Sequence, residues 1–81
     1  MAKRVKIEHK KIGRHQAVGL AYKEERRIVL DSRLKGKDYI CTAVHELLHI
    51  HRPELSEEEV DKLSTELTND LWDLGIRKVE E

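Results

Sequence analysis

A single proline divides the C-terminal half of this chain into two segments with helical periodicity. Pro53 has no amide hydrogen, and its ring clashes with the preceding turn, so a helix cannot continue through it. Apolar residues recur at helical spacing from about Asp38 to Ile50, with Asp38 as the expected N-cap, and recur again from Ser56 to Leu74. We therefore predict two helices joined by a short turn around Pro53.

The second helical segment carries clear start and stop signals. Ser56 and Glu59 have the spacing of a capping box, and Gly75 is placed to end the helix. At 100° per residue its apolar residues fall on one face, which we expect to pack on the core: Val60, Leu63, Leu67, Leu71 and Leu74.

The N-terminal half has the patterns of short strands. Residues 5–9 alternate apolar and polar side chains, and residues 17–22 and 27–30 are β-prone runs separated by four charged residues, as in a β-hairpin. We predict an α+β fold in which a small antiparallel sheet of about three strands packs on the two helices, as a single domain over residues 1–81. No apolar run is long enough to span a membrane.

Composition limits how much core such a domain can bury. The chain has 81 residues, of which 38% are hydrophobic and 40% charged, with no Phe and one Trp. A core this thin would gain stability from a bound metal or a partner chain. Cys41 is the only cysteine, which excludes an intrachain disulfide and favours a cytosolic protein.

The net charge of zero hides an uneven distribution. Residues 1–14 hold six basic side chains against Glu8, whereas residues 54–81 hold ten acidic side chains against three basic ones. A basic arm that binds nucleic acid would be built from Lys3, Arg4, Lys6, Lys10, Lys11 and Arg14. The stretch is short and lacks interleaved aromatic residues, so attraction between the two ends of the chain is the preferred interpretation, and nucleic acid is not an expected partner.

The first helical segment contains the sequence His45–His49, which matches the pattern H-E-x-x-H. This spacing places two imidazoles one helical turn apart, so both can reach one metal ion. A catalytic zinc site combines such ligands with a third protein ligand and a water molecule. We therefore expect His45 and His49 to bind one zinc ion and Glu46 to act as the general base. At 100° per residue, the polar residues of this helical segment share one face: Asp38, Thr42, His45, Glu46 and His49.

The third ligand is not settled by spacing. A histidine six residues after His49 would complete one known type of site, but position 55 is Leu. In the second helix Glu58 points away from the core, while Glu57 and Glu59 flank the apolar face on opposite sides. Periodicity therefore leaves Glu57 and Glu59 as equal candidates.

A family resemblance separates these two candidates. The H-E-x-x-H motif followed by Glu59-Val-Asp-Lys-Leu-Ser resembles the ImmA/IrrE-type and minimal gluzincin metallopeptidases, whose second motif reads Glu-Ala-Asn-x-Phe-Ala. The chain also looks like small metallopeptidase-like proteins of phages and mobile elements, and the resemblance covers roughly residues 17 to 76. It implies that Glu59 is the third zinc ligand, with Glu57 in reserve; without a metal role, Glu59 would serve the capping box.

The expected function is zinc-dependent hydrolysis of a peptide or protein substrate, with the isolated chain open to self-inhibition by one of its tails. The alternative is a zinc-stabilised binding module without catalysis. Tyr22 and Tyr39 are the candidate oxyanion donors, and nothing in the sequence selects between them. His51 is expected at the helix end and Cys41 as a small buried residue, neither of them a ligand.

Overall fold

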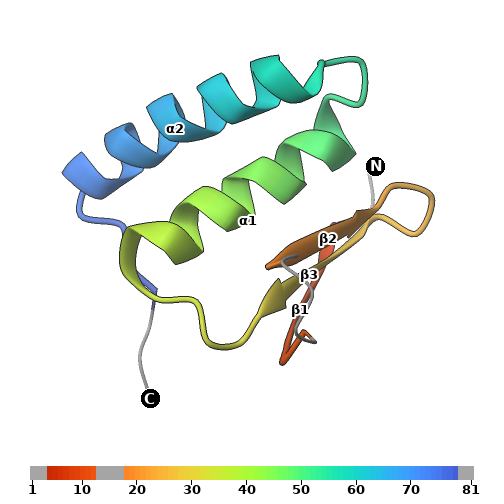
Figure 1. Ribbon diagram of the computed structural model, residues 1–81, viewed down its shortest axis with the longest axis horizontal. Coiled ribbons are helices and arrows are strands. Elements are labelled where there is room, and N and C mark those ends of the chain that lie inside the picture. Colours follow the sequence, from red (N-terminus) through yellow and green to blue (C-terminus); the bar gives the residue numbers. More distant parts are fainter. Residues whose placement is uncertain (1–3, 13–17, 79–81) are drawn as a thin grey trace.

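The computed structural model describes residues 4–12 and 18–78 and shows a sheet covered by two helices in succession (Figure 1). Helix α1 lies on one face of the sheet, and helix α2 packs on α1 rather than on the strands. This arrangement confirms the predicted α+β class, the hairpin and both helices. The elements in chain order are β1 (Lys6–Lys10), β2 (Gly19–Tyr22), β3 (Arg27–Asp31), α1 (Gly36–His51) and α2 (Glu57–Asp73).

The sheet has the strand order β1-β3-β2 and is mixed, whereas the sequence patterns predicted an antiparallel sheet. Strand β2 pairs antiparallel with β3 through the hairpin, but β1 pairs parallel with β3. The central place of β3 follows from its side chains, because Ile28, Val29 and Leu30 are all buried and need cover on both faces. Strand β1 has more charged residues than β3 and occupies one edge of the sheet. Strand β2 forms the other edge.

Helix α1 begins three residues earlier than the predicted N-cap implies. Lys35 occupies the N-cap position without a side-chain capping bond, and Gly36 takes a positive φ of 59°. Asp38, the expected N-cap, lies instead within the first turn, where a carboxylate interacts favourably with the helix dipole. The helix ends at His51, just before Arg52 and Pro53, as the proline predicts.

The start and stop signals of α2 are confirmed. The Ser56 hydroxyl accepts a hydrogen bond from the Glu59 amide at 3.1 Å, and the Ser56 amide donates to the Glu59 carboxylate at 2.9 Å. At the other end Gly75 has a φ of 88°, and the amides of Gly75 and Ile76 bond back to the carbonyls of Trp72 and Leu71. These bonds form a Schellman motif that ends the helix.

The core lies between the sheet and α1, where Ile28 and Leu30 meet Ile50. The second helix contributes to burial through a face that overlaps the predicted one only in part. Its buried residues are Val60, Ser64 and Thr68, whereas Leu67 is 36% exposed and Leu74 is 75% exposed. Leu63 and Leu71 of the predicted face are half-buried. The helix is therefore turned so that Ser64 and Thr68 are buried together with Val60, while Leu67 and Leu74 lie toward solvent. Neither helix in the described ranges combines the length and apolar character needed to cross a bilayer.

Asp31 ends β3 as a buried carboxylate and links stability to pH. The Arg33 side chain donates hydrogen bonds to it at 2.9 and 2.7 Å, and the Arg33 amide donates a third at 2.9 Å. These bonds hold the pKa of Asp31 well below its usual range. A carboxylate with a lowered folded-state pKa contributes stability above its unfolded pKa of about 3.9, and this contribution is lost as the pH falls below it.

We therefore expect the free energy of unfolding of the wild type to fall more steeply below about pH 5 than that of Asp31→Asn. The variant should be less stable at pH 7, and the two curves should approach each other in acid. Urea unfolding from pH 7 to pH 3 measures both curves, with the exposed Glu66→Gln as the control. Parallel curves for the wild type and Asp31→Asn would contradict the expectation.

Candidate metal centre

Helix α1 brings the two histidines of the H-E-x-x-H motif together. They lie one turn apart on the same face, and their Nε2 atoms are 3.3 Å apart. Two nitrogen ligands on the tetrahedral shell of one zinc ion, each about 2.0–2.1 Å from it, would be separated by ~3.3 Å. The two imidazoles therefore already have the separation that a shared metal ion requires.

Helix α2 supplies the third member of the cluster, and it is Glu57. Its Oε1 atom lies 2.8 Å from His49 Nε2, and one ligand atom from each of His45, His49 and Glu57 falls within 4.8 Å of the others. Glu57 is the first residue of α2, so the turn after Pro53 directly sets its position. Its side chain is 73% exposed and can adjust when an ion binds.

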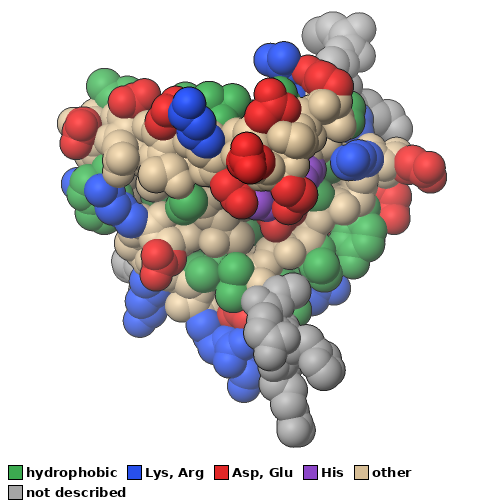
Figure 2. Space-filling view, turned by 45° about the horizontal axis from the view of Figure 1, so that its top comes forward, with side chains coloured by type: hydrophobic (Ala, Val, Ile, Leu, Met, Phe, Trp, Pro, Cys, Tyr) green, Lys and Arg blue, Asp and Glu red, His purple; other side chains and the backbone are tan. Residues whose placement is uncertain are grey.

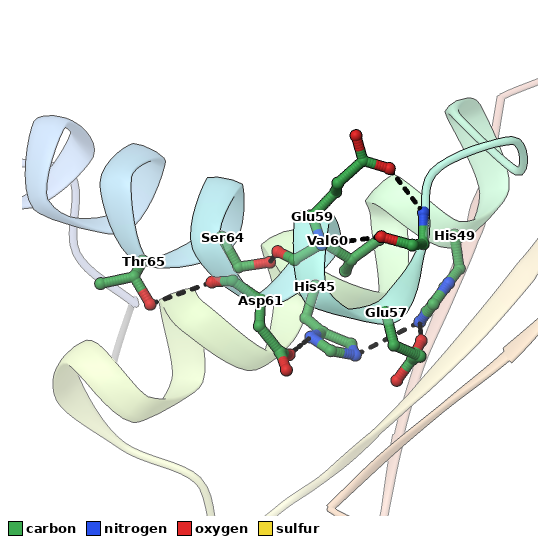
Figure 3. Close-up of polar contacts among 9 residues, drawn as sticks. His45, His49, Glu57, Glu59, Val60, Asp61, Ser64 and Thr65 are labelled. Carbon is green, nitrogen blue, oxygen red and sulfur yellow. Dashed lines mark hydrogen bonds and ion pairs between the residues drawn. The ribbon is translucent and has the colours of Figure 1, made fainter.

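The structure does not bring Glu59 to the histidines. Its carboxylate accepts the Ser56 amide at the start of α2 and points away from the cluster (Figure 3). These hydrogen bonds from Ser56 lower the pKa of Glu59, as expected for a carboxylate that caps a helix. The sequence left Glu59 with two possible roles, a helix cap or a metal ligand. The geometry shows the cap.

Asp61 is a further member of the site that sequence reasoning did not single out. Its Oδ1 atom lies 3.2 Å from His45 Nδ1, on the side of the ring away from His49 (Figure 3). A carboxylate at Nδ1 favours a proton there and leaves Nε2 free to bind a metal. The available signal was its spacing, because Asp61 follows Glu57 by one helical turn, as His49 follows His45.

Glu46 points into a pocket beside these ligands. The pocket measures about 280 Å³ and is lined by Val18, Gly19, Cys41, Thr42, His45 and Glu46. Burial raises the pKa of Glu46, and Glu57 adds to this effect, while the two histidines oppose it. Glu46, the expected general base, is the acidic residue among those that line the pocket.

Strand β2 approaches Glu46 so closely that its residue there must be small. A Cβ atom at Gly19 would lie 2.9 Å from Glu46 Oε2 and 2.8 Å from Thr42 Cγ2. Cβ atoms in proteins almost never make contacts this short, so a larger residue would force the Glu46 side chain, the Thr42 side chain or the strand to shift. Gly19 therefore defines the wall against which Glu46 rests.

The other candidates lie away from the cluster. His9 Nε2 is 2.7 Å from the Tyr39 hydroxyl, and Tyr22 stacks under the Arg27 guanidinium, so the structure engages both tyrosines elsewhere. His51 is exposed at the end of α1. Cys41 is half-buried in the pocket wall and is outside the group that could hold an ion among the described residues.

The site is open to solvent and acidic. The His45 and His49 side chains are 24% and 20% exposed. Histidine surface is visible among acidic side chains near the middle of the face in Figure 2.

Comparisons with models of known protein families, with curated proteins and with solved structures found no match. The function of the cluster is therefore argued from its chemistry.

Proposed function

We propose that this chain is a zinc-dependent metallopeptidase of the gluzincin type, in which His45, His49 and Glu57 hold one zinc ion. The observation that carries the proposal is the convergence of ligand atoms from two helices next to the Glu46 pocket. Two imidazoles and one carboxylate form a ligand set typical of catalytic zinc sites, which leave a coordination position for water.

The protein's own residues have distinct tasks in this chemistry. A zinc ion at the site would lower the pKa of a water molecule and polarise the carbonyl of the scissile bond. Glu46 accepts the proton of the attacking water and delivers it to the leaving amine. Burial raises the pKa of Glu46 above that of an ordinary carboxyl group, which makes its carboxylate a better proton acceptor.

The substrate we propose is an extended peptide held by β2. This strand is an edge of the sheet, so one side of its backbone makes no strand pairing with the part of the chain that the structure describes. Gly19 of β2 and Glu46 of α1 line the same pocket, so a peptide added to this edge would pass the catalytic base.

We also propose a cytosolic location, because a lone cysteine gives no sign of a disulfide-forming compartment.

Asp61 should strengthen zinc binding through His45. We expect Asp61→Ala to weaken zinc affinity by about 10–100-fold, because the ring loses the carboxylate that orients it. Competition with a chromophoric chelator measures the affinity. Glu58→Ala is the matched control, since it removes a carboxylate from an exposed position of the same helix. Equal losses in both variants would show only a general charge effect.

The proposal is tested by zinc content and peptide cleavage measured on the same preparation. We expect about one zinc per chain by emission spectroscopy and cleavage of an unstructured peptide library, detected by mass spectrometry. Removing zinc with a chelator should stop cleavage, and adding zinc back should restore it. A protein that holds no zinc after reconstitution would refute the site, and one that holds zinc without cleaving any peptide would refute the enzyme.

A structural zinc site is the second candidate, and one observation favours it. The proposed ligands come from both helices, so an ion would tie α2 to α1 in a domain whose buried side chains are few. In that case zinc removal would lower the melting temperature strongly, and the zinc-loaded protein would cleave nothing. Retained folding without zinc, together with zinc-dependent cleavage, would favour the enzyme.

A further inference from the structure

The orientation of α2 leaves Leu67 and Leu74 exposed at its surface. The helix buries Val60, Ser64 and Thr68, and at 100° per residue the centre of this buried line is Ser64. The buried Thr68 hydroxyl has no hydrogen-bond partner within residues 4–12 and 18–78, so burial of side chains alone does not favour this face. The same orientation turns Glu57 and Asp61 toward the histidines.

Three leucines lie beside this buried line and form a row on one flank of α2. Glu57 and Asp61 lie on the opposite flank. Leu67 is 36% exposed and Leu74 is 75% exposed. Leu63, which lies closer to the start of the helix, is half-buried. Beyond the Schellman turn, Ile76 is a further apolar residue that is 48% exposed. We call Leu63, Leu67 and Leu74 the leucine row.

The charge around the leucine row indicates what could cover it. Helix α2 contains seven acidic residues and one basic residue, Lys62. Helical spacing places Glu59, Glu66 and Asp70 along the outer border of the row. Acidic side chains recur along the α2 side of the molecule (Figure 2). An apolar row bordered by carboxylates complements a helix with one apolar face and basic flanks.

We propose that the leucine row is a docking surface for a basic amphipathic helix of a partner protein. A second copy of this chain fits less well, because pairing α2 with α2 would bring two sets of seven acidic residues together. The surface is separate from the metal centre, so the proposal goes beyond the proposed enzyme and does not depend on it.

The test uses a synthetic helical peptide of Leu and Lys as the probe. A second peptide has the same composition in an order that forms no apolar face. Fluorescence anisotropy should show that the wild type binds the amphipathic peptide at least about tenfold more tightly than the reordered one. Leu67→Gln with Leu74→Gln should remove this difference, and Glu66→Gln with Asp70→Asn should weaken binding and its salt dependence.

Two controls separate docking from loss of folding or general stickiness. Ile7→Gln changes an exposed apolar residue on β1, far from α2 in the chain, and should leave binding unchanged. Leu74→Gln alone alters a largely exposed side chain that cannot be needed for the core, and should weaken binding in a protein with a wild-type circular dichroism spectrum. Equal binding of both peptides, unchanged binding by the leucine variants, or a dimer in sedimentation that Leu67→Gln dissociates would overturn the proposal.

Discussion

We expect Glu57→Ala to weaken zinc binding by more than about 100-fold and Glu59→Ala to leave it unchanged. Loss of a direct ligand should exceed the 10–100-fold effect typical of residues that only support a ligand. The two glutamates are two residues apart in the first turn of the same helix, so the pair is matched in charge and chemistry. Chelator competition gives both affinities.

The two variants should also separate in stability. Glu59→Ala removes half of the capping box and should lower the urea midpoint of the metal-free protein, whereas Glu57→Ala should change it less. Loss of zinc affinity in Glu59→Ala, with normal affinity in Glu57→Ala, would return the ligand role to Glu59. The resemblance in the second motif would then outweigh the geometry of the cluster.

Glu46→Gln should keep about one zinc per chain and lower peptide cleavage by about 10²–10⁴-fold. Glutamine has nearly the same size as glutamate but cannot accept the proton of the attacking water. Emission spectroscopy and cleavage rates on one preparation separate the two properties. Cleavage at the wild-type rate by a zinc-loaded Glu46→Gln would exclude Glu46 as the base.

Gly19→Ala should lower cleavage without changing the chemistry of any proposed catalytic or ligand residue. The added methyl group would meet the Glu46 carboxylate and the Thr42 methyl group at less than 3 Å, and the flexible end of the Glu46 side chain is the part that can move most easily. We expect a fall in kcat of at least about tenfold, as small displacements of catalytic groups produce, with zinc content unchanged. Leu20→Ala, the next residue of β2, points to the other face of the sheet and is the control. Equal kcat values for Gly19→Ala and wild type would show that Glu46 tolerates the displacement.

Local signals in the sequence determined the elements and half of the candidate site. Pro53 separates the helices, Ser56 and Glu59 start the second one, and Gly75 ends it, because each acts through its own backbone and nearest neighbours. The juxtaposition of His45 and His49 is equally local, since one turn of helix brings their rings together. These features were predictable because they require no knowledge of what packs against them.

Tertiary packing alone decided the features that depend on how one element lies on another. The parallel pairing of β1 with β3 depends on which edge of the sheet was left open, and periodicity within β1 carries no information about direction. The rotation of α2 about its axis placed Glu57 and Asp61 beside the histidines and left the leucine row exposed. Hydrophobic periodicity alone favours the leucine face, whereas in the folded chain α2 buries Val60 of that face together with the small side chains of Ser64 and Thr68.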